Sequence, residues 1–209
     1  MNQNPKHIVV AMTGATGAIY FMRTLRALLM AGHRVDLLIS NYGNFTLKEE
    51  TDFGEFKGSF AEYFFHKYGD EVKRGELVQY NYKDLAAPLA SGSGIGDGMV
   101  IVPCTMKTLA AVAHGYSSNL IERAADVVLK ENRTLVIVPR EAPLNLVHLK
   151  NMLAAAEAGA RIVPASPAFY QHPRTFDDLG DFIASRILNL FEIRLSLYSE
   201  WEGRHSKKP

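Results

Sequence analysis

The sequence has little of what marks exported, membrane-spanning or zinc-binding proteins. Its only cysteine is Cys104, so an intrachain disulfide framework is excluded and a reducing cytoplasm fits best. No spacing of cysteine and histidine residues resembles a zinc site. No segment approaches the roughly 20 uninterrupted apolar residues of a membrane-spanning helix, and the N-terminus lacks an apolar stretch with a small-residue cleavage site. We therefore expect a cytoplasmic protein with no metal, no export signal and no membrane span.

Neither sign of charge is in excess. Lys and Arg number 23 and Asp and Glu number 22, which gives a formal net charge of +1. Surfaces for nucleic acid or lipid are usually strongly basic, so neither is an expected partner. Hydrophobic residues make up 47% and charged residues 22%, a composition typical of a soluble globular protein. A chain of 209 residues suits one compact domain, and we expect residues 1–209 to form a single domain.

Short apolar runs rich in β-branched residues recur along the chain. They predict strands that are covered on both faces, at residues 7–12, 35–39, 99–102, 134–138 and, more weakly, 160–164. Between these runs, apolar residues recur every three or four positions, which predicts helices at about residues 17–31, 105–114, 119–131, 143–158 and 175–191. Strands that alternate with helices predict an α/β fold, a Rossmann-like (flavodoxin-like) three-layer sandwich around a doubly wound parallel sheet.

Two regions give weaker patterns. Between residues 43 and 90 only residues 55–68 fit a helix, and residues 84–97 are rich in Ala, Pro, Ser and Gly, which fits either an ordered loop or a functional lid. The C-terminal tail comprises residues 192–209, and after Arg194 it is polar apart from Leu195, Leu197, Tyr198 and Trp201. We expect this tail to contact another subunit, with packing onto its own domain as the alternative.

Loops that follow the predicted strands carry groups suited to a phosphorylated ligand. The first strand runs into Thr13-Gly14-Ala15-Thr16-Gly17-Ala18, where small residues and a helix N-terminus let backbone N–H groups approach an anion. Ser40 follows the second strand, and Pro103-Cys104-Thr105-Met106-Lys107-Thr108 follows the third. The carboxyl ends of parallel strands meet at one edge, so three hydroxyl-bearing loops predict phosphate binding there. Tight packing at the first loop and helix capping by Ser40 stay as alternatives.

The fourth strand delivers Arg140 and Glu141 to the same edge. An arginine there can bind phosphate through two N–H groups and a glutamate can transfer protons, although an Arg-Glu pair also caps helices. His114 and His148 lie in helical patterns, which favours packing or capping over a role as ligands. Cys104 fits a small buried residue better than a nucleophile, because no basic partner is evident nearby.

Seven short motifs occur in the order found in a known family. They are Gly14-Ala15-Thr16-Gly17-Ala18, Glu50-Thr51-Asp52, Ala90-Ser91-Gly92-Ser93, Cys104-Thr105-Met106-Lys107-Thr108-Leu109, Arg123-Ala124-Ala125-Asp126-Val127-Val128-Leu129-Lys130-Glu131, Pro139-Arg140-Glu141-Ala142-Pro143-Leu144 and Pro167-Ala168-Phe169-Tyr170. In this order they resemble the UbiX family of flavin prenyltransferases, collinearly from about residue 7 to residue 191.

The resemblance implies an activity, a cofactor and partners. The enzyme would join a dimethylallyl group from dimethylallyl monophosphate to N5 and C6 of reduced FMN, and the prenylated FMN would serve a UbiD-type decarboxylase. Members typically form closed homo-oligomers, often dodecamers, in which neighbouring chains complete each site. No metal is expected, and the chain has no evident acidic magnesium motif of the kind used for diphosphates.

The resemblance also implies which residues form the site. The flavin would be bound by Gly14, Ala15, Thr16, Ser40, Thr105, Met106, Lys107, Thr108 and Arg140. The prenyl phosphate would be bound by Glu50, Arg123, Lys130, Tyr170 and Arg186. Catalytic roles would fall on Thr16, Glu50, Glu141 and Tyr170. The family usually has Ser at positions 16 and 105, and Thr at both positions keeps the hydroxyl while adding a methyl group.

Two other functions compete with this one. An FMN-dependent cysteine decarboxylase of the same fold would carry a functional Asn where this chain has Lys107. A non-catalytic flavin carrier would have no use for a second phosphate site, which Glu141, Tyr170 and Arg186 indicate. Both are therefore weaker than the prenyltransferase hypothesis.

Overall fold

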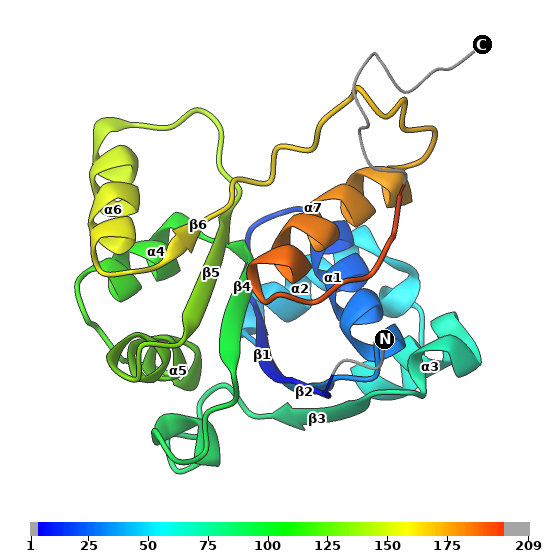
Figure 1. Ribbon diagram of the computed structural model, residues 1–209, viewed down its shortest axis with the longest axis horizontal. Coiled ribbons are helices and arrows are strands. Elements are labelled where there is room, and N and C mark those ends of the chain that lie inside the picture. Colours follow the sequence, from blue (N-terminus) through cyan, green and yellow to red (C-terminus); the bar gives the residue numbers. More distant parts are fainter. Residues whose placement is uncertain (1–3, 199–209) are drawn as a thin grey trace.

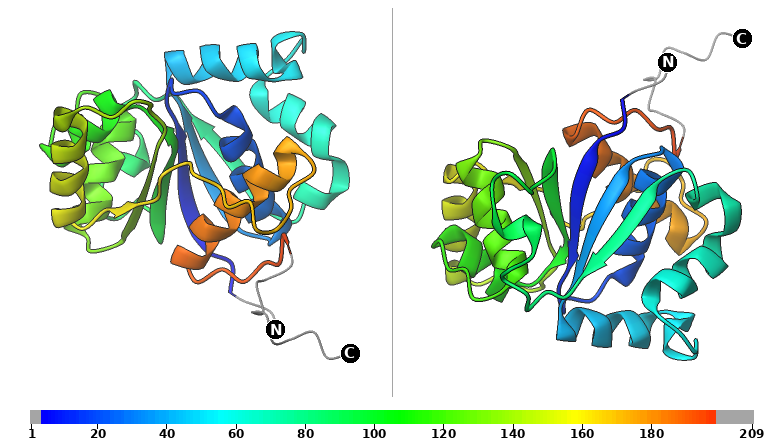
Figure 2. Two further views of the ribbon diagram at one scale, coloured as in Figure 1. Left: turned by 90° about the horizontal axis from the view of Figure 1, so that it is seen from above. Right: turned by 90° about the horizontal axis from the view of Figure 1, so that it is seen from below.

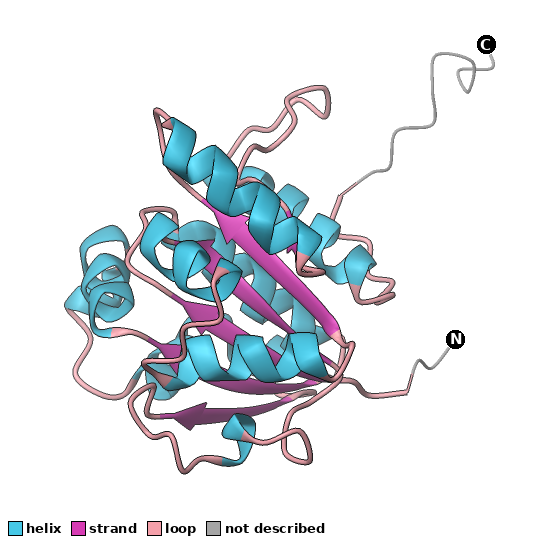
Figure 3. Cartoon of the chain, turned by 90° about the vertical axis from the view of Figure 1, so that its left-hand side faces the viewer, coloured by secondary structure: helices cyan, strands magenta, loops and turns pink. Residues whose placement is uncertain are grey.

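The computed structural model describes residues 4–198, and its centre is a six-stranded sheet (Figure 1). The strands are β1 (His7–Met12), β2 (Arg34–Ile39), β3 (Glu76–Tyr80), β4 (Gly98–Cys104), β5 (Thr134–Pro139) and β6 (Arg161–Ile162). Every paired strand is parallel to its neighbour (Figure 3). The order is β3-β2-β1-β4-β5-β6, the doubly wound arrangement in which the chain changes direction between β1 and β4. The predicted fold class is confirmed.

The helices follow the strands in alternation. They are α1 (Ala18–Met30), α2 (Asn41–Glu50), α3 (Phe60–Tyr68), α4 (Met106–Ala113), α5 (Leu120–Lys130), α6 (Leu146–Glu157) and α7 (Phe176–Leu190), with short 3-10 turns η1 (Asp52–Gly54), η2 (Gly69–Val72) and η3 (Pro88–Ala90). All five helices predicted from the apolar spacing are present, and α3 lies within the weaker 55–68 segment. The sequence prediction missed α2 and β3.

Side chains alternate across the sheet and build two cores. On one face, Val10 and Met12 of β1 pack in a cluster with residues of α1, α3 and α7. On the other face, Val9 and Ala11 pack in a cluster with residues of α4 and α5. Figure 2 shows these helix layers on opposite sides of the sheet, with α6 outside α4. The run 7–12 is apolar throughout because both faces of β1 are covered.

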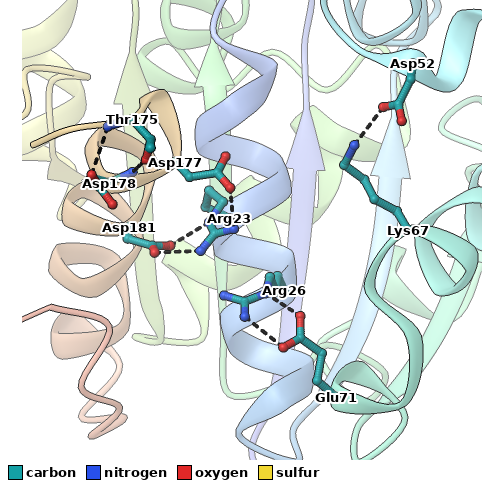
Figure 4. A network of polar contacts seen from close by, with 9 residues as sticks. All are labelled: Arg23, Arg26, Asp52, Lys67, Glu71, Thr175, Asp177, Asp178 and Asp181. Carbon is teal, nitrogen blue, oxygen red and sulfur yellow. Dashed lines mark hydrogen bonds and ion pairs between the residues drawn. The ribbon is translucent and has the colours of Figure 1, made fainter.

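Ion pairs fasten α1 to the elements that surround it (Figure 4). Arg23 donates from Nε and Nη2 to the two carboxylate oxygens of Asp181 on α7, each at 2.6 Å, and from Nη1 to Asp177 at 3.0 Å. Arg26 donates to Glu71 of η2 at 2.5 and 2.8 Å. The Arg23 guanidinium is largely buried, so it needs these carboxylates to offset its desolvation.

The structure bears on two segments for which the sequence left alternatives open. Residues 84–97 lie as an ordered loop whose Leu89 and Ile95 are buried against the α5 side of the sheet. Of the tail, Leu195 and Leu197 pack on the first core, whereas Trp201 and the other residues after 198 lie outside the described residues. A subunit contact by the tail stays a prediction. Within residues 4–198, no helix has the length and apolar content to cross a membrane.

Candidate active site

A cavity of about 790 Å³ lies at the carboxyl ends of β1, β2 and β4. Its walls come from the loops after these strands, from the segment after β3 and from the start of α5. The lining residues are Thr13, Gly14, Ser40, Asn41, Tyr42, Tyr82, Lys83, Thr105, Lys107, Thr108, Ser118, Asn119 and Ile121. The position matches the switch point of the strand order, where open parallel sheets bind ligands. A cavity of this size and polarity accommodates a cofactor of nucleotide size.

Thr13 joins two of the loops that form this cavity. Its hydroxyl donates to the carbonyl of Pro103 at 3.0 Å and accepts from the backbone N–H of Thr105 at 2.8 Å. Thr105 is in turn the N-cap of α4, and its hydroxyl accepts from Thr108 N at 3.3 Å. One buried hydroxyl therefore fixes the β1 loop against the start of α4. Thr13 stands in the motif predicted to bind phosphate, but nothing in the sequence distinguishes it from the other residues of that loop.

The N-terminus of α2 faces the same cavity. Ser40 is its N-cap and accepts from Gly43 N at 2.9 Å, which confirms the capping interpretation. Asn41 and Tyr42 also line the cavity, and N–H groups in the first turn of a helix have no intrahelical acceptor. A Cβ at Gly14 would lie 2.4 Å from Tyr42 Cβ, so only glycine permits this close approach. Together these groups form a site suited to an anion.

The N-terminus of α1, by contrast, is occupied by the protein itself. Glu50 Oε2 accepts from Gly17 N at 2.8 Å and from Ala18 N at 2.7 Å. Gly17, the N-cap, has φ 106°, a left-handed conformation that favours glycine. The sequence pattern predicted an external phosphate on these N–H groups, and the structure differs because a carboxylate from the end of α2 already holds them.

A buried carboxylate supports the part of the cavity wall that Lys107 and Ser118 form. Glu122 of α5 accepts from Ser118 N at 2.9 Å and from Ser118 Oγ at 2.5 Å, and it pairs with Lys107 Nζ. Burial alone would raise the pKa of the Glu122 carboxyl, but hydrogen bonds from Lys107 and Ser118 outweigh burial and hold that pKa below its ordinary value. Glu122 is therefore a carboxylate at neutral pH, bonded to the Lys107 side chain at the cavity wall.

Five predicted flavin-site residues line the cavity: Gly14, Ser40, Thr105, Lys107 and Thr108. The other four do not line it: Ala15, Thr16 and Met106 are close in sequence to lining residues after β1 and β4, whereas Arg140 belongs to the loop after β5. Thr16 is exposed and Met106 is buried. Arg140 follows β5 and is close enough to Tyr20 of α1 to oppose, in part, the rise in the tyrosine pKa that burial causes.

The predicted prenyl-phosphate residues do not reach this cavity within one chain. Arg123 donates to the carbonyl of Ala90 at 3.1 Å and to Asp126 at 2.8 Å, and Lys130 pairs with Glu131 at 2.7 Å. Arg123 and Lys130 are seven residues apart and so lie on one face of α5. Of the other residues predicted for the prenyl phosphate, Glu50 bonds to the N-terminus of α1, and Tyr170 and Arg186 are exposed. The predicted catalytic residue Glu141 is exposed as well.

Tyr170 and Arg186 lie on the opposite helix layer from α5. The Tyr170 ring meets Phe182 of α7 edge-on at 6.3 Å between centroids, and Arg186 is a residue of α7 itself. Since α5 and α7 cover opposite faces of the sheet (Figure 1), one chain keeps the predicted phosphate-binding cations apart.

Three residues with reactive side chains have structural roles. Burial raises the pKa of the Cys104 thiol far above its ordinary value, so Cys104 is a small buried residue, as predicted, and not a nucleophile. His114 ends α4 and contacts Asn151 at 3.1 Å, and His148 forms a capping box with Asn145. Within residues 4–198, no three metal-binding side chains gather into a candidate metal site.

The fold and this cavity define a class of protein. The chain belongs to the flavoprotein family, whose family model matches residues 1–188. More distant solved structures share the fold alone. The FMN-dependent cysteine decarboxylase SpaF is 15% identical, with a TM-score of 0.54 over 78% of this chain and 86% of that one.

Within this family, the chain is a member of the UbiX-type flavin prenyltransferases. The flavin prenyltransferase UbiX of Pseudomonas aeruginosa is 44% identical over 202 residues, which cover 96% of each chain. A structure of AnUbiX (PadA1) with FMN and dimethylallyl pyrophosphate is 42% identical, with a TM-score of 0.84 over 96% of this chain and 99% of that one. A dodecameric FMN-dependent UbiX-like decarboxylase from Escherichia coli O157:H7 is 40% identical, with a TM-score of 0.81 over 94% and 100%.

Proposed function

We propose that this chain transfers a dimethylallyl group from dimethylallyl monophosphate to N5 and C6 of reduced FMN. The observation that carries the proposal is the 790 Å³ cavity at the switch point, with hydroxyl groups and a free helix N-terminus at its edges. Relatives at 42–44% identity are flavin prenyltransferases, and one was solved with both FMN and a dimethylallyl phosphate ester.

The cavity offers a place for the phosphate of a flavin mononucleotide. The N–H groups at the start of α2, with Gly14 and Ser40, line the cavity, and no described carboxylate bonds to them. We assign the flavin phosphate to this end. Thr105, Lys107 and Thr108 then lie along the rest of the flavin. When bound, the reduced flavin supplies the flat, electron-rich ring on which the allylic carbon is captured.

The second substrate needs cations and proton carriers. Arg123, Lys130 and Arg186 supply positive charge for the departing phosphate, with Tyr170 and Glu50 as further contacts. Glu141 and Tyr170 carry protons, and the Thr16 hydroxyl acts near the flavin N5. Because one chain separates the α5 cations from Tyr170 and Arg186, we infer that these groups come together between neighbouring copies. A closed homo-oligomer, a dodecamer as in the Escherichia coli relative, provides such neighbours.

The product has a recipient outside this chain. We propose that prenylated FMN passes to a UbiD-type decarboxylase in the cytoplasm. The free buried thiol of Cys104 fits a reducing compartment. No other metal or cofactor is part of the proposal.

Mass spectrometry of the flavin tests the proposed function. The protein is incubated without oxygen with reduced FMN and dimethylallyl monophosphate, and the flavin is then released and weighed. We expect a flavin heavier by one dimethylallyl unit. FMN returned unchanged, despite tight binding, would identify a flavin carrier and overturn the proposal. Dimethylallyl diphosphate, tested in parallel, establishes which donor is preferred.

A further inference from the structure

Glu122 is a buried acid to which the proposed reaction assigns no role. Its side chain is 1% exposed, and carboxylates are rarely buried so completely unless they are paired. Glu122 is the third residue of α5, where a negative charge is also stabilised by the helix dipole. A purely structural role would be to cap this helix.

Capping does not account for both oxygens of this carboxylate. Asn119 already caps α5, since its side chain accepts from Ile121 N at 3.0 Å and from Glu122 N at 3.1 Å. Glu122 Oε2 serves the preceding turn by accepting from Ser118 N and Ser118 Oγ. Glu122 Oε1 instead accepts from Lys107 Nζ, which comes from a different helix, α4. The second oxygen therefore links α5 to a residue of the cavity wall.

Lys107 gains a fixed position from this contact. Its side chain is 69% exposed and lines the cavity, and an exposed lysine side chain otherwise samples many rotamers. A charge-assisted bond to a buried acid restricts it to one of them. An ammonium has three N–H donors, so Lys107 keeps donors for a ligand after bonding to Glu122.

The charges of the residues around the cavity indicate which kind of ligand atom accepts a hydrogen bond from Lys107. Among the described residues that line the cavity there are two lysines and no acid. The charge of Lys107 is offset by Glu122, whereas Lys83 lies over the Tyr82 ring at 5.8 Å and has no carboxylate partner in the described part of the chain. A neutral pair adds little attraction for a dianionic phosphate, but its N–H groups still suit an uncharged oxygen.

We propose that Glu122 is a positioning residue that holds the Lys107 ammonium at the cavity wall, where it donates to an uncharged oxygen of the flavin and not to the phosphate. The inference rests on the proposed flavin site and names the part of the ligand that this pair recognises.

Binding of two flavins to the full-length protein tests the inference. Dissociation constants for FMN and for riboflavin, which lacks the phosphate, are measured by quenching of flavin fluorescence for the wild type, Lys107→Met and Glu122→Gln. We expect each variant to weaken both flavins by about the same factor, roughly tenfold for the loss of one charge-assisted hydrogen bond. Weakening of FMN alone would show that Lys107 meets the phosphate and would overturn the proposal.

The double variant and a remote control separate positioning from stability. Lys107→Met/Glu122→Gln leaves no buried charge unpaired, and we expect it to bind both flavins as Lys107→Met does, because the two residues act as one unit. If the factors by which the two single substitutions weaken flavin binding multiply in the double variant, Glu122 does not position Lys107. An unchanged affinity of Glu122→Gln would show the same.

The control variant is Glu71→Gln, which breaks the ion pair with Arg26 away from the cavity. We expect it to lower the melting temperature without changing either dissociation constant. A wild type that binds neither flavin would overturn the proposed function itself.

Discussion

Three hydroxyl side chains, those of Thr13, Ser40 and Thr105, hold in place the loops that line the cavity at the switch point. Each forms a hydrogen bond to a backbone N–H group, so each fixes main chain as well as offering an oxygen to a ligand. The sequence pattern predicted that hydroxyl-bearing loops would converge at this edge. It did not predict Glu122, because a buried acid at the start of a helix has the same local sequence as an ordinary exposed capping residue.

Glu141 gives a prediction at the residue scale. It is exposed just after β5 and does not line the cavity, so Glu141→Gln should leave FMN affinity within about twofold of the wild type. If Glu141 carries a proton, prenylation should slow by about 100-fold or more, a usual effect of losing a general acid or base. Single-turnover formation of prenylated FMN and fluorescence titration of FMN measure the two effects. Loss of FMN binding would instead mean that Glu141 is structural.

At the scale of elements, the sequence predicted the strands and helices that have a regular apolar pattern, and it missed the two elements that lack one. The edge strand β3 reads Glu-Leu-Val-Gln-Tyr, and none of its residues is fully buried, so it lacks the apolar run of a central strand. Helix α2 contains Gly43 and exposes Tyr42 and Phe45, which obscures its helical period. Because α2 was not predicted, the sequence placed the anion site at the N-terminus of α1. In the structure, the N-terminus of α2 lines the cavity instead.

The contact between α1 and α7 gives a prediction at the element scale. Asp181→Asn removes the charge that pairs with the buried Arg23 guanidinium, and we expect it to lower the free energy of unfolding by about 3 kcal/mol. Asp177→Asn is the matched control, because its side chain is 57% exposed and its loss should cost less than about 1 kcal/mol. Urea denaturation of both variants measures the difference, and equal losses would contradict the assignment of Asp181 as the principal partner.

Helix α6 presents apolar side chains on the surface of the molecule, and these would contact water if the protein were a monomer. On α6, Leu146, Val147 and Leu153 are 65%, 62% and 60% exposed. If this surface lies between copies of the chain, Leu153→Glu should give a smaller particle than the wild type in light scattering. Lys73→Glu, an exposed change on the opposite helix layer, should keep the wild-type particle size. An unchanged particle for Leu153→Glu would place the contact elsewhere.

Acid should destabilise the whole molecule through its paired carboxylates. The hydrogen bond from Arg26 holds the pKa of Glu71 below its ordinary value of 4.5 in the folded chain. This stabilisation is fully present above the unfolded pKa and is lost as pH falls through the lowered folded pKa. We expect the melting temperature to drop as pH falls below about 4.5, and to drop less for Glu71→Gln than for the wild type. Melting curves at a series of pH values check both expectations.

The Glu50 carboxylate, which ends α2 and bonds to the N-terminus of α1, also affects which nucleotides the fold can bind. In dinucleotide-binding domains with this strand order, the first helix N-terminus holds the pyrophosphate of NAD. Here the same N–H groups already bond to Glu50, so a pyrophosphate brought to them would meet negative charge in place of donors. The strand order is that of a dinucleotide-binding domain, but we expect the chain to bind NAD and NADP weakly. The switch point is therefore left open to a mononucleotide, even in a cell rich in pyridine dinucleotides.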